Sequence, residues 1–207
     1  MRYGEKAVAG AEPGRITFDQ IGATLFRVTN RPSAPGQRTT PLVLQARLAG
    51  SGRFEFTGDF DLTARHLDYA YRGTVRHLDG ERLNGTLLNL QGMRIRHGVL
   101  DSAWFKVDVK HDTAVGRVTL VYHDLEAELR DRVTHKRGLK KKIKTFVMNH
   151  FELHQANPKD GDDPVKNVPV RLVRTPDMAF FEFVWKTLRQ GLLETVAGRS
   201  DTSKNGD

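Results

Sequence analysis

The sequence contains no cysteine, and this absence removes two classes of architecture. A chain without thiols has no disulfide framework and offers no sulfur ligand to a structural zinc or an iron–sulfur cluster. The absence is compatible with a reducing or an oxidising compartment. The fold therefore depends on a hydrophobic core, which a chain of 207 residues is long enough to build.

Long apolar runs are missing as well. No stretch approaches the ~18 residues that a helix needs to cross a bilayer. The first fifteen residues, MRYGEKAVAGAEPGR, lack the apolar centre of a secretory signal. The chain is then either cytosolic or the end of a longer protein whose targeting segment lies elsewhere. We expect the second, because a strand candidate follows the N-terminus with no capping element before it.

Signatures of catalysis are largely absent too. The chain has no phosphate-loop pattern, no dinucleotide fingerprint and no nucleophile elbow. Asp59 and Asp61 lie two residues apart, which is the spacing of a solvated strand face. His150 and His154 could share a metal on a helix, but the glutamate between them is misplaced for a zinc protease, so surface histidines fit better. We expect no enzymatic activity, no cofactor and no metal.

Lys and Arg outnumber Asp and Glu by 33 to 25, which gives a formal charge of +8. Such a surplus suits nucleic acid, anionic lipid or acidic partners alike. Aromatic side chains do not alternate with the densest basic run, as stacking on nucleic-acid bases would require, so we expect no nucleic-acid partner. The run instead predicts contact with a membrane surface, the alternative being a solvated helix end. Its lysines are Lys140, Lys141, Lys142 and Lys144.

The dominant pattern that is present is alternation of apolar and polar residues. It is clearest in residues 93–129, where two alternating runs flank the polar corner 111–113. A period of two places successive side chains on opposite faces of a strand, so this segment predicts an antiparallel hairpin. Similar runs predict strands at 16–18, 23–29, 42–48, 53–62, 67–75 and 168–173, whereas 81–91 fits a short helix or a strand.

These runs predict a mainly β fold, in which a curved antiparallel sheet forms an open hydrophobic groove and a C-terminal amphipathic helix follows. We expect one domain over residues 1–197, with a loop at 31–41, a closing helix at 177–197 and a disordered tail at 198–207. The apolar side of the strands could instead be the core of a sandwich or barrel. We favour a groove for apolar ligands because the chain offers few elements to cover so long a sheet. The predicted groove residues are Phe54, Phe56, Phe60, Leu62, Tyr69, Tyr71, Phe105, Val107, Val109, Val118, Leu120 and Tyr122.

The closing helix is predicted from its start signal and its stripe. Thr175, Pro176 and Asp177 supply a cap residue, a proline for the first helical position and an early acid. The stripe either packs on the end of the sheet and plugs the groove, or lies in a membrane interface, where tryptophan is favoured. We favour a helix that caps the groove and can swing out to a bilayer. Its predicted stripe is Phe181, Val184, Trp185, Leu188 and Leu192.

The order of these features resembles the C-terminal region of AsmA-like envelope proteins, the relatives of TamB. The matching segments are FDQIGATLFRVTN, RFEFTGDFDL, LNGTLLNLQGMRIRHGVLDS, AVGRVTLVYHDLEAEL and FFEFVWKTLRQGLLETVAG. The resemblance implies an elongated β-groove, anchored at its other end in the inner membrane of a diderm bacterium, that carries phospholipid across the periplasm. The family offers no catalytic residues to transfer. This chain departs from the family pattern because it lacks the membrane-anchoring N-terminus.

We therefore expect a non-enzymatic lipid-binding module, the terminal section of a periplasmic groove that conducts phospholipid between inner and outer membranes. Its partners would be acyl chains and a membrane surface in the cell envelope. One alternative is a scaffold for outer-membrane protein assembly, in which an exposed edge strand pairs with an envelope protein. A basic nucleic-acid-binding β domain is the weaker alternative.

Overall fold

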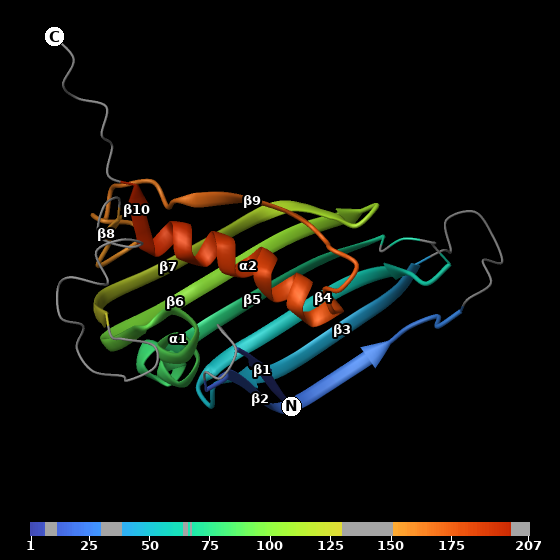
Figure 1. Ribbon diagram of the computed structural model, residues 1–207, viewed down its shortest axis with the longest axis horizontal. Helices are drawn as coiled ribbons and strands as arrows, with labels where there is room; N and C mark the ends of the chain where they lie inside the picture. Colours follow the sequence, from blue (N-terminus) through green and yellow to red (C-terminus); the bar gives the residue numbers. More distant parts are fainter. Residues whose placement is uncertain (7–11, 30–38, 64–65, 67, 130–150, 200–207) are drawn as a thin grey trace, which may run out of the picture.

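The computed structural model describes residues 1–6, 12–29, 39–63, 66, 68–129 and 151–199. These residues form one antiparallel eight-stranded sheet, a small two-stranded sheet and two α-helices (Figure 1). The large sheet has the order β1-β2-β3-β4-β5-β6-β7-β9, and it curves without closing. Its strands are β1 (Arg2–Glu5), β2 (Gly14–Leu25), β3 (Thr39–Leu48), β4 (Gly52–Asp61), β5 (Tyr69–Asp79), β6 (Met93–Lys110), β7 (Thr113–Leu129) and β9 (Asn167–Val173). The prediction of a mainly β fold with a curved open sheet and a C-terminal helix is confirmed.

The longest strands, β6 and β7, form the predicted hairpin. Lys110 pairs with Thr113, so the connection has two residues, His111 and Asp112. Both have positive φ angles, of 48° and 61°. This left-handed conformation matches the right-handed twist of the flanking strands. The carboxylate of Asp68, just before β5, accepts a hydrogen bond of 2.8 Å from the His111 N–H and fixes the turn against its neighbour.

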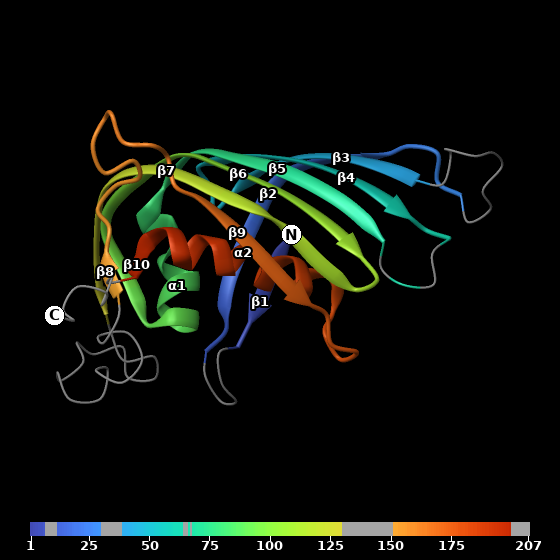
Figure 2. The same cartoon turned by 90° about the horizontal axis from the view of Figure 1, so that it is seen from above.

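Bulges bend the sheet into a trough. The β2–β3 register shifts between Asp19 and Gly22, and the intervening Gln20 has a φ of 50°. The β6–β7 register shifts beside Asp124, whose φ is 53°. An extra residue in one strand of a pair bends that strand and increases its twist. Figure 2 shows the result, a sheet that arches over α2 (Phe180–Val196).

The concave side of the trough is occupied by helices. A 3₁₀ turn (Gly80–Leu83) leads into α1 (Asn84–Gln91), which packs at the strongly curled end and resolves the ambiguous segment 81–91 as helical. The helix is tied to β2 because the Thr86 hydroxyl donates to the Arg15 carbonyl at 2.6 Å. The longer α2 crosses the concave side of the strands that follow β4 (Figures 1 and 2). Part of the predicted groove is thus filled by the chain itself.

Three predicted boundaries are wrong. The loop predicted at 31–41 ends earlier, because β3 begins at Thr39 and Thr40 pairs with Phe60. The closing helix begins at Phe180 rather than 177, since Pro176 and Asp177 form a turn in which Met178 donates to the Thr175 carbonyl. Its end is also different. Residues Ala197–Arg199 form β10, which pairs with β8 (Phe151–Leu153), so the predicted tail of 198–207 begins inside a strand.

Candidate functional site

The concave face of the sheet collects most of the predicted groove residues. Opposite residues of antiparallel neighbours share a face. The register therefore aligns Phe54, Phe56 and Phe60 of β4 with Val75, Gly73 and Tyr69 of β5. It continues by pairing Tyr71 with Val107, and Phe105 with Val118. Alternation along single strands was thus sufficient to predict which side chains meet on one face of the sheet.

Glycines make room for the aromatic rings on this face. Gly73 pairs with both Phe56 and Phe105, and a Cβ placed on it would lie 2.4 Å from the Phe105 ring. Gly58 pairs with Tyr71, and a Cβ there would lie 2.7 Å from the Phe60 ring. A side chain at either position would overpack the face. The two glycines therefore determine how densely the rings can be placed.

The rings form a continuous row across the concave face. Neighbouring ring centroids lie 5.3–6.3 Å apart along this row, a separation typical of favourable aromatic pairs. In order, the row contains Phe18, Phe54, Phe56, Tyr71, Tyr69 and then both Phe60 and Phe180. It begins on β2 and ends on α2, so sheet and helix share one apolar surface.

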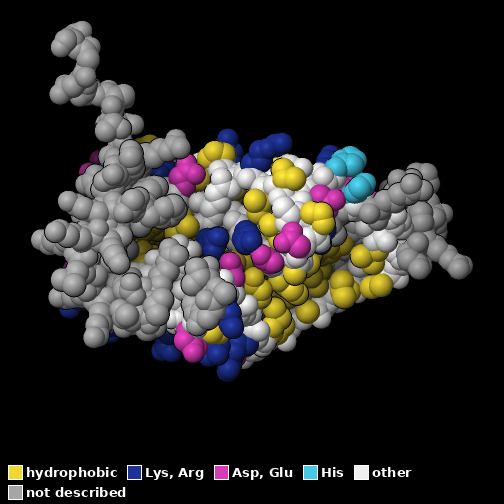
Figure 3. Space-filling model, in the orientation of Figure 1, with side chains coloured by type: hydrophobic (Ala, Val, Ile, Leu, Met, Phe, Trp, Pro, Cys, Tyr) yellow, Lys and Arg dark blue, Asp and Glu magenta, His cyan; other side chains and the backbone are white. Residues whose placement is uncertain are grey.

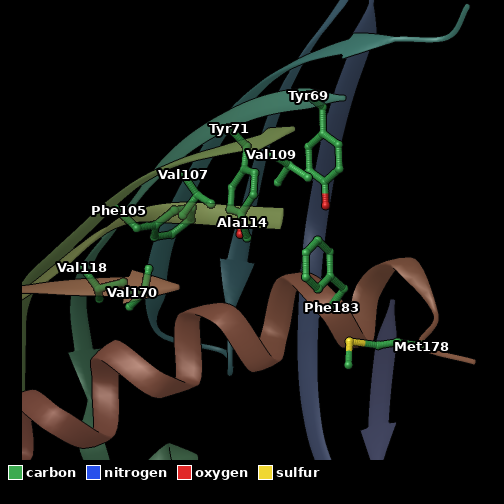
Figure 4. Close-up of a cluster of buried hydrophobic side chains, with 10 residues drawn as sticks. All are labelled: Tyr69, Tyr71, Phe105, Val107, Val109, Ala114, Val118, Val170, Met178 and Phe183. Carbon is green, nitrogen blue, oxygen red and sulfur yellow. The ribbon is translucent and has the colours of Figure 1, made fainter. Parts of the chain in front are cut away.

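Under α2 this surface is a buried core and not an open groove. Figure 4 shows ten side chains packed between the sheet and the helix, with Phe183 directed toward the sheet. For this part of the concave face, the prediction of an open groove is wrong, because the helix excludes solvent from it. The predicted groove residues that are buried are Tyr69, Tyr71, Phe105, Val107, Val109, Val118, Leu120 and Tyr122.

The helix meets the sheet through a different face from the one predicted. Its buried residues are Phe183, Thr187, Gly191 and Thr195, whereas Phe181 is 55% exposed. The other members of the predicted stripe, Val184, Trp185, Leu188 and Leu192, are half-buried. The prediction that Phe181 lies on the packing stripe is therefore wrong. The buried face of α2 consists of Phe183 and three smaller residues, Thr187, Gly191 and Thr195.

Small residues allow the helix to approach closely. A Cβ on Gly191 would lie 2.6 Å from the Val118 Cβ and 3.0 Å from Val170 Cγ1. The buried threonines donate their hydroxyls to carbonyls one turn earlier, Thr187 to Phe183 and Thr195 to Gly191, each at 2.8 Å. Their polar atoms are satisfied inside the helix, so the sheet meets their methyl groups.

Four polar side-chain atoms on α2 and on the strands around it are buried without a hydrogen-bond partner among the described residues. They are the hydroxyls of Tyr69 and Tyr71, the indole N–H of Trp185 and one carboxylate oxygen of Glu5. Burial raises the pKa of both tyrosines. A buried donor or acceptor without a partner costs about 1–3 kcal/mol. The packing of α2 on the sheet therefore has a free-energy cost that comes from these unpaired polar atoms.

Beyond α2, part of the concave face is open to solvent where the second half of β2 meets β3 and β4. Leu25 pairs with Leu42, and Leu44 pairs with Phe56, so these side chains share the concave face. Leu25 is 57% exposed. Apolar side chains gather over β3 and β4 beside the N-terminal end of α2 (Figure 3). We call this surface the open apolar strip, and it consists of Leu25, Leu42, Leu44, Phe56, Phe60 and Phe181.

Half of this strip is absent from the predicted groove residues. Alternation predicted strands at 23–29 and 42–48, but Leu25, Leu42 and Leu44 were not among the residues expected to line the groove. Conversely, Leu62 was predicted to lie in the groove, and it follows the end of β4 in a turn, 50% exposed. Glu5 was also missed, because residues 1–13 show no clear period. It lies on β1 and forms an ion pair of 3.4 Å with Arg189 of α2.

Within the described ranges, no group of three or more His, Asp and Glu side chains is placed to hold a metal ion. Asp59 is exposed, as predicted for a solvated strand face. The backbone N–H of His154 donates to the Val196 carbonyl, and its own carbonyl accepts from the Tyr122 hydroxyl, whose pKa is raised by burial to about 12. His150 and the lysines Lys140, Lys141, Lys142 and Lys144 lie outside the described residues.

One surface ion pair gives a pH-dependent prediction. The Asp101 carboxylate lies 2.8 Å from Nδ1 of His123, and this hydrogen bond raises the pKa of the imidazole. Because the folded pKa is the higher one, the stabilisation is complete below the unfolded pKa of about 6.5 and is lost as pH rises through the folded pKa. In an NMR titration, Asp101→Asn should lower the midpoint of His123. An unchanged midpoint would show that the pair does not form in solution.

None of the described helices is long and apolar enough to span a membrane. No protein-family model, curated protein or solved structure matches the chain.

Proposed function

We propose that this protein is a non-enzymatic lipid-binding module that holds an acyl chain along the open apolar strip. One observation carries the proposal, the row of solvent-exposed and half-buried apolar side chains on the concave face of an unclosed sheet. A soluble surface rarely keeps so many large apolar residues in one hollow unless something covers them. The arrangement supports binding, because the strip is lined by apolar side chains.

The dimensions of the strip suit an acyl chain. Phe56 and Phe60 lie four residues apart on β4, and a strand rises about 3.3 Å per residue, so the strip runs for about 13 Å along this strand. One leaflet of a bilayer contributes half of a hydrocarbon core of about 30 Å. Most of an extended acyl chain therefore fits along the strip. Each methylene removed from water contributes about 0.8 kcal/mol, which is sufficient to hold a lipid without any specific polar contact.

Charge placed on the strip should abolish lipid binding without unfolding the protein. We expect Leu25→Asp and Leu44→Asp to lose at least about 90% of co-purifying lipid, because an aspartate beside an acyl chain is a desolvated charge. Lipid extracted from gently purified protein would be measured by mass spectrometry. Val43→Asp is the matched control, since Val43 lies between Leu42 and Leu44 on the opposite face and is 41% exposed.

The control should retain lipid, and circular dichroism of all three variants should show the wild-type β signal. Equal lipid loss from Val43→Asp would mean that charge on either face disturbs the sheet, and the strip would have no special role. Lipid retention in both concave-face variants would contradict the proposal directly. A wild-type protein that carries no lipid, and takes up none from vesicles, would do the same.

The wider role remains part of the proposal and depends on the resemblance to AsmA-like proteins. On that basis the protein is the terminal section of a periplasmic groove, located in the cell envelope, that conducts phospholipid between the inner and outer membranes. Sliding along an apolar strip needs no nucleotide and no chemistry, which is consistent with the arrangement described above. The lysine run would contact anionic headgroups, and vesicle binding that weakens with added salt is its expected behaviour.

A further inference from the structure

The two edges of the large sheet differ in how they are protected. At the β9 edge, Pro169 has no N–H to offer, and the Arg171 N–H donates to the side-chain oxygen of Gln190 on α2 at 3.4 Å. Proline and side-chain caps are established ways of preventing an edge strand from pairing with another chain. The β9 edge is therefore blocked by its own sequence and by the helix.

The β2 edge is protected over only half its length. β1 pairs with Gly14–Thr17, and the Phe18 N–H donates to the Met1 carbonyl. From Asp19 to Leu25, β2 is exposed, and no described strand pairs with its outer side. This half contains neither lysine nor proline. The only protection seen in its described surroundings is the bulge at Gln20, and its register with β3 is regular from Gly22 to Leu25.

The outward hydrogen-bonding groups of this edge can be identified from the register. The Phe26 N–H donates to the Pro41 carbonyl on β3. The backbone N–H and C=O of Phe26 therefore point toward β3, which we call inward, and away from the free side of β2. Inward and outward positions alternate along a regular antiparallel strand, which directs the N–H and C=O of Ala23 and Leu25 outward. Ile21 lies next to them at the bulge, where the register with β3 is interrupted. Ala23 and Leu25 pair with Leu44 and Leu42, so the outward positions carry concave-face side chains.

We propose that this edge pairs with the same edge of a second copy of the chain, antiparallel and centred on Ala23. Self-pairing about Ala23 brings Ile21 of each copy beside Leu25 of the other, so two exposed apolar side chains cover each other. It also brings Asp19 of each copy to the same end as Arg27 of the other. Both side chains are exposed, and neither forms an ion pair with the described residues. Opposite charges at both ends of the pairing favour a second copy over a strand of unrelated sequence.

A two-fold axis through Ala23 leaves both concave faces on the same side of the joined sheet. Ala23 of each copy then exchanges about two backbone hydrogen bonds with Ala23 of the other. Two sheets of eight strands would form one trough, and the open apolar strips, which begin at β2, would adjoin at its centre. This association does not depend on what the strip binds, so lipid content and self-association can be measured separately on the same protein.

Sedimentation equilibrium of the full chain over micromolar to millimolar concentrations tests the pairing. The wild type should show a monomer–dimer equilibrium, and Ala23→Pro should remain monomeric, because proline removes the central outward N–H. Ala23→Val is the control, since it keeps the N–H and favours strands. A wild type that is monomeric throughout would overturn the proposal, and so would an Ala23→Pro variant that is folded by circular dichroism and dimerises normally.

A charge exchange gives a second test that does not alter the backbone. Asp19→Arg and Arg27→Asp should each weaken the dimer by about tenfold, because each sets like charges against each other at both ends. The double variant D19R/R27D restores opposite charges across the two-fold axis and should recover the dimer. The double variant recovers the dimer only if residue 19 of one copy meets residue 27 of the other, as pairing between identical edges requires. A dimer that is indifferent to the single changes, or is not restored by the double change, would show that this edge does not pair with itself.

Discussion

Replacing Phe183 with alanine should lower the free energy of unfolding by about 3–5 kcal/mol, the usual cost of removing a buried phenylalanine ring. The side chain is 0% exposed and packs within the core cluster that contains Tyr69, Tyr71 and Phe105. A fully enclosed site leaves a cavity when it is truncated, since the surrounding strands relax only in part. Urea denaturation followed by circular dichroism measures the change.

Phe181→Ala is the matched control, two residues away on the same helix. Its ring is 55% exposed, so we expect a change below about 0.5 kcal/mol. The stripe predicted from the sequence gives the opposite order, because it includes Phe181 and does not include Phe183. Equal losses in the two variants, or a larger loss for Phe181→Ala, would show that α2 packs through the predicted stripe and not through the face described here.

Much of the sheet could be predicted because its strands alternate with little interruption. In residues 53–62 every second side chain is apolar or glycine, and β4 spans Gly52–Asp61. A period of two that is bounded by turns indicates a β-strand. Both the presence of the strand and the face on which each side chain lies are therefore predictable. β1 was not predicted because its own composition carries no strand signal. It is a strand because it pairs with β2. Isolated short strands carry little local signal.

The packing face of α2 could not be predicted from apolar periodicity. The stripe rule counts large apolar residues, but close approach to a sheet needs small ones. Thr187, Gly191 and Thr195 are buried, and even a Cβ at Gly191 would lie 2.6 Å from the Val118 Cβ. The larger residues Val184, Leu188 and Leu192 pack at the sides of this contact. Contact distance is a property of the two surfaces together, and the sequence of the helix alone does not contain it.

The same limit applies to the groove. Alternation predicted that Phe56 and Phe105 share a face, and they do, but it could not tell which of them would be covered. Phe105 is buried under α2, whereas Phe56 belongs to the open apolar strip. That difference depends on where one helix crosses the sheet. The bulges at Gln20 and Asp124, which curve the sheet around the helix, have no recognisable residue signal either.

Leucine in place of Gly191 should displace α2 from the sheet and increase the amount of bound lipid. A Cβ at this position already lies 2.6 Å from the Val118 Cβ, so a leucine side chain cannot be accommodated without moving the helix. We expect a loss of about 1–3 kcal/mol in the free energy of unfolding from overpacking. The loss is limited because displacement lets the buried hydroxyls of Tyr69 and Tyr71 reach hydrogen-bond partners. Displacement also extends the open apolar strip over the aromatic row, which gives lipid more surface.

Gln190→Leu is the control for this change. It adds the same side chain to the exposed side of the same turn, and it removes only the 3.4 Å hydrogen bond to the Arg171 N–H. Lipid per protein, measured by mass spectrometry after incubation with phospholipid vesicles, should rise in Gly191→Leu and stay at the wild-type level in Gln190→Leu. If Gly191→Leu is destabilised but remains folded and binds no additional lipid, α2 fills a core and does not control access to the sheet. If it binds more, the helix is a displaceable cover of the concave face.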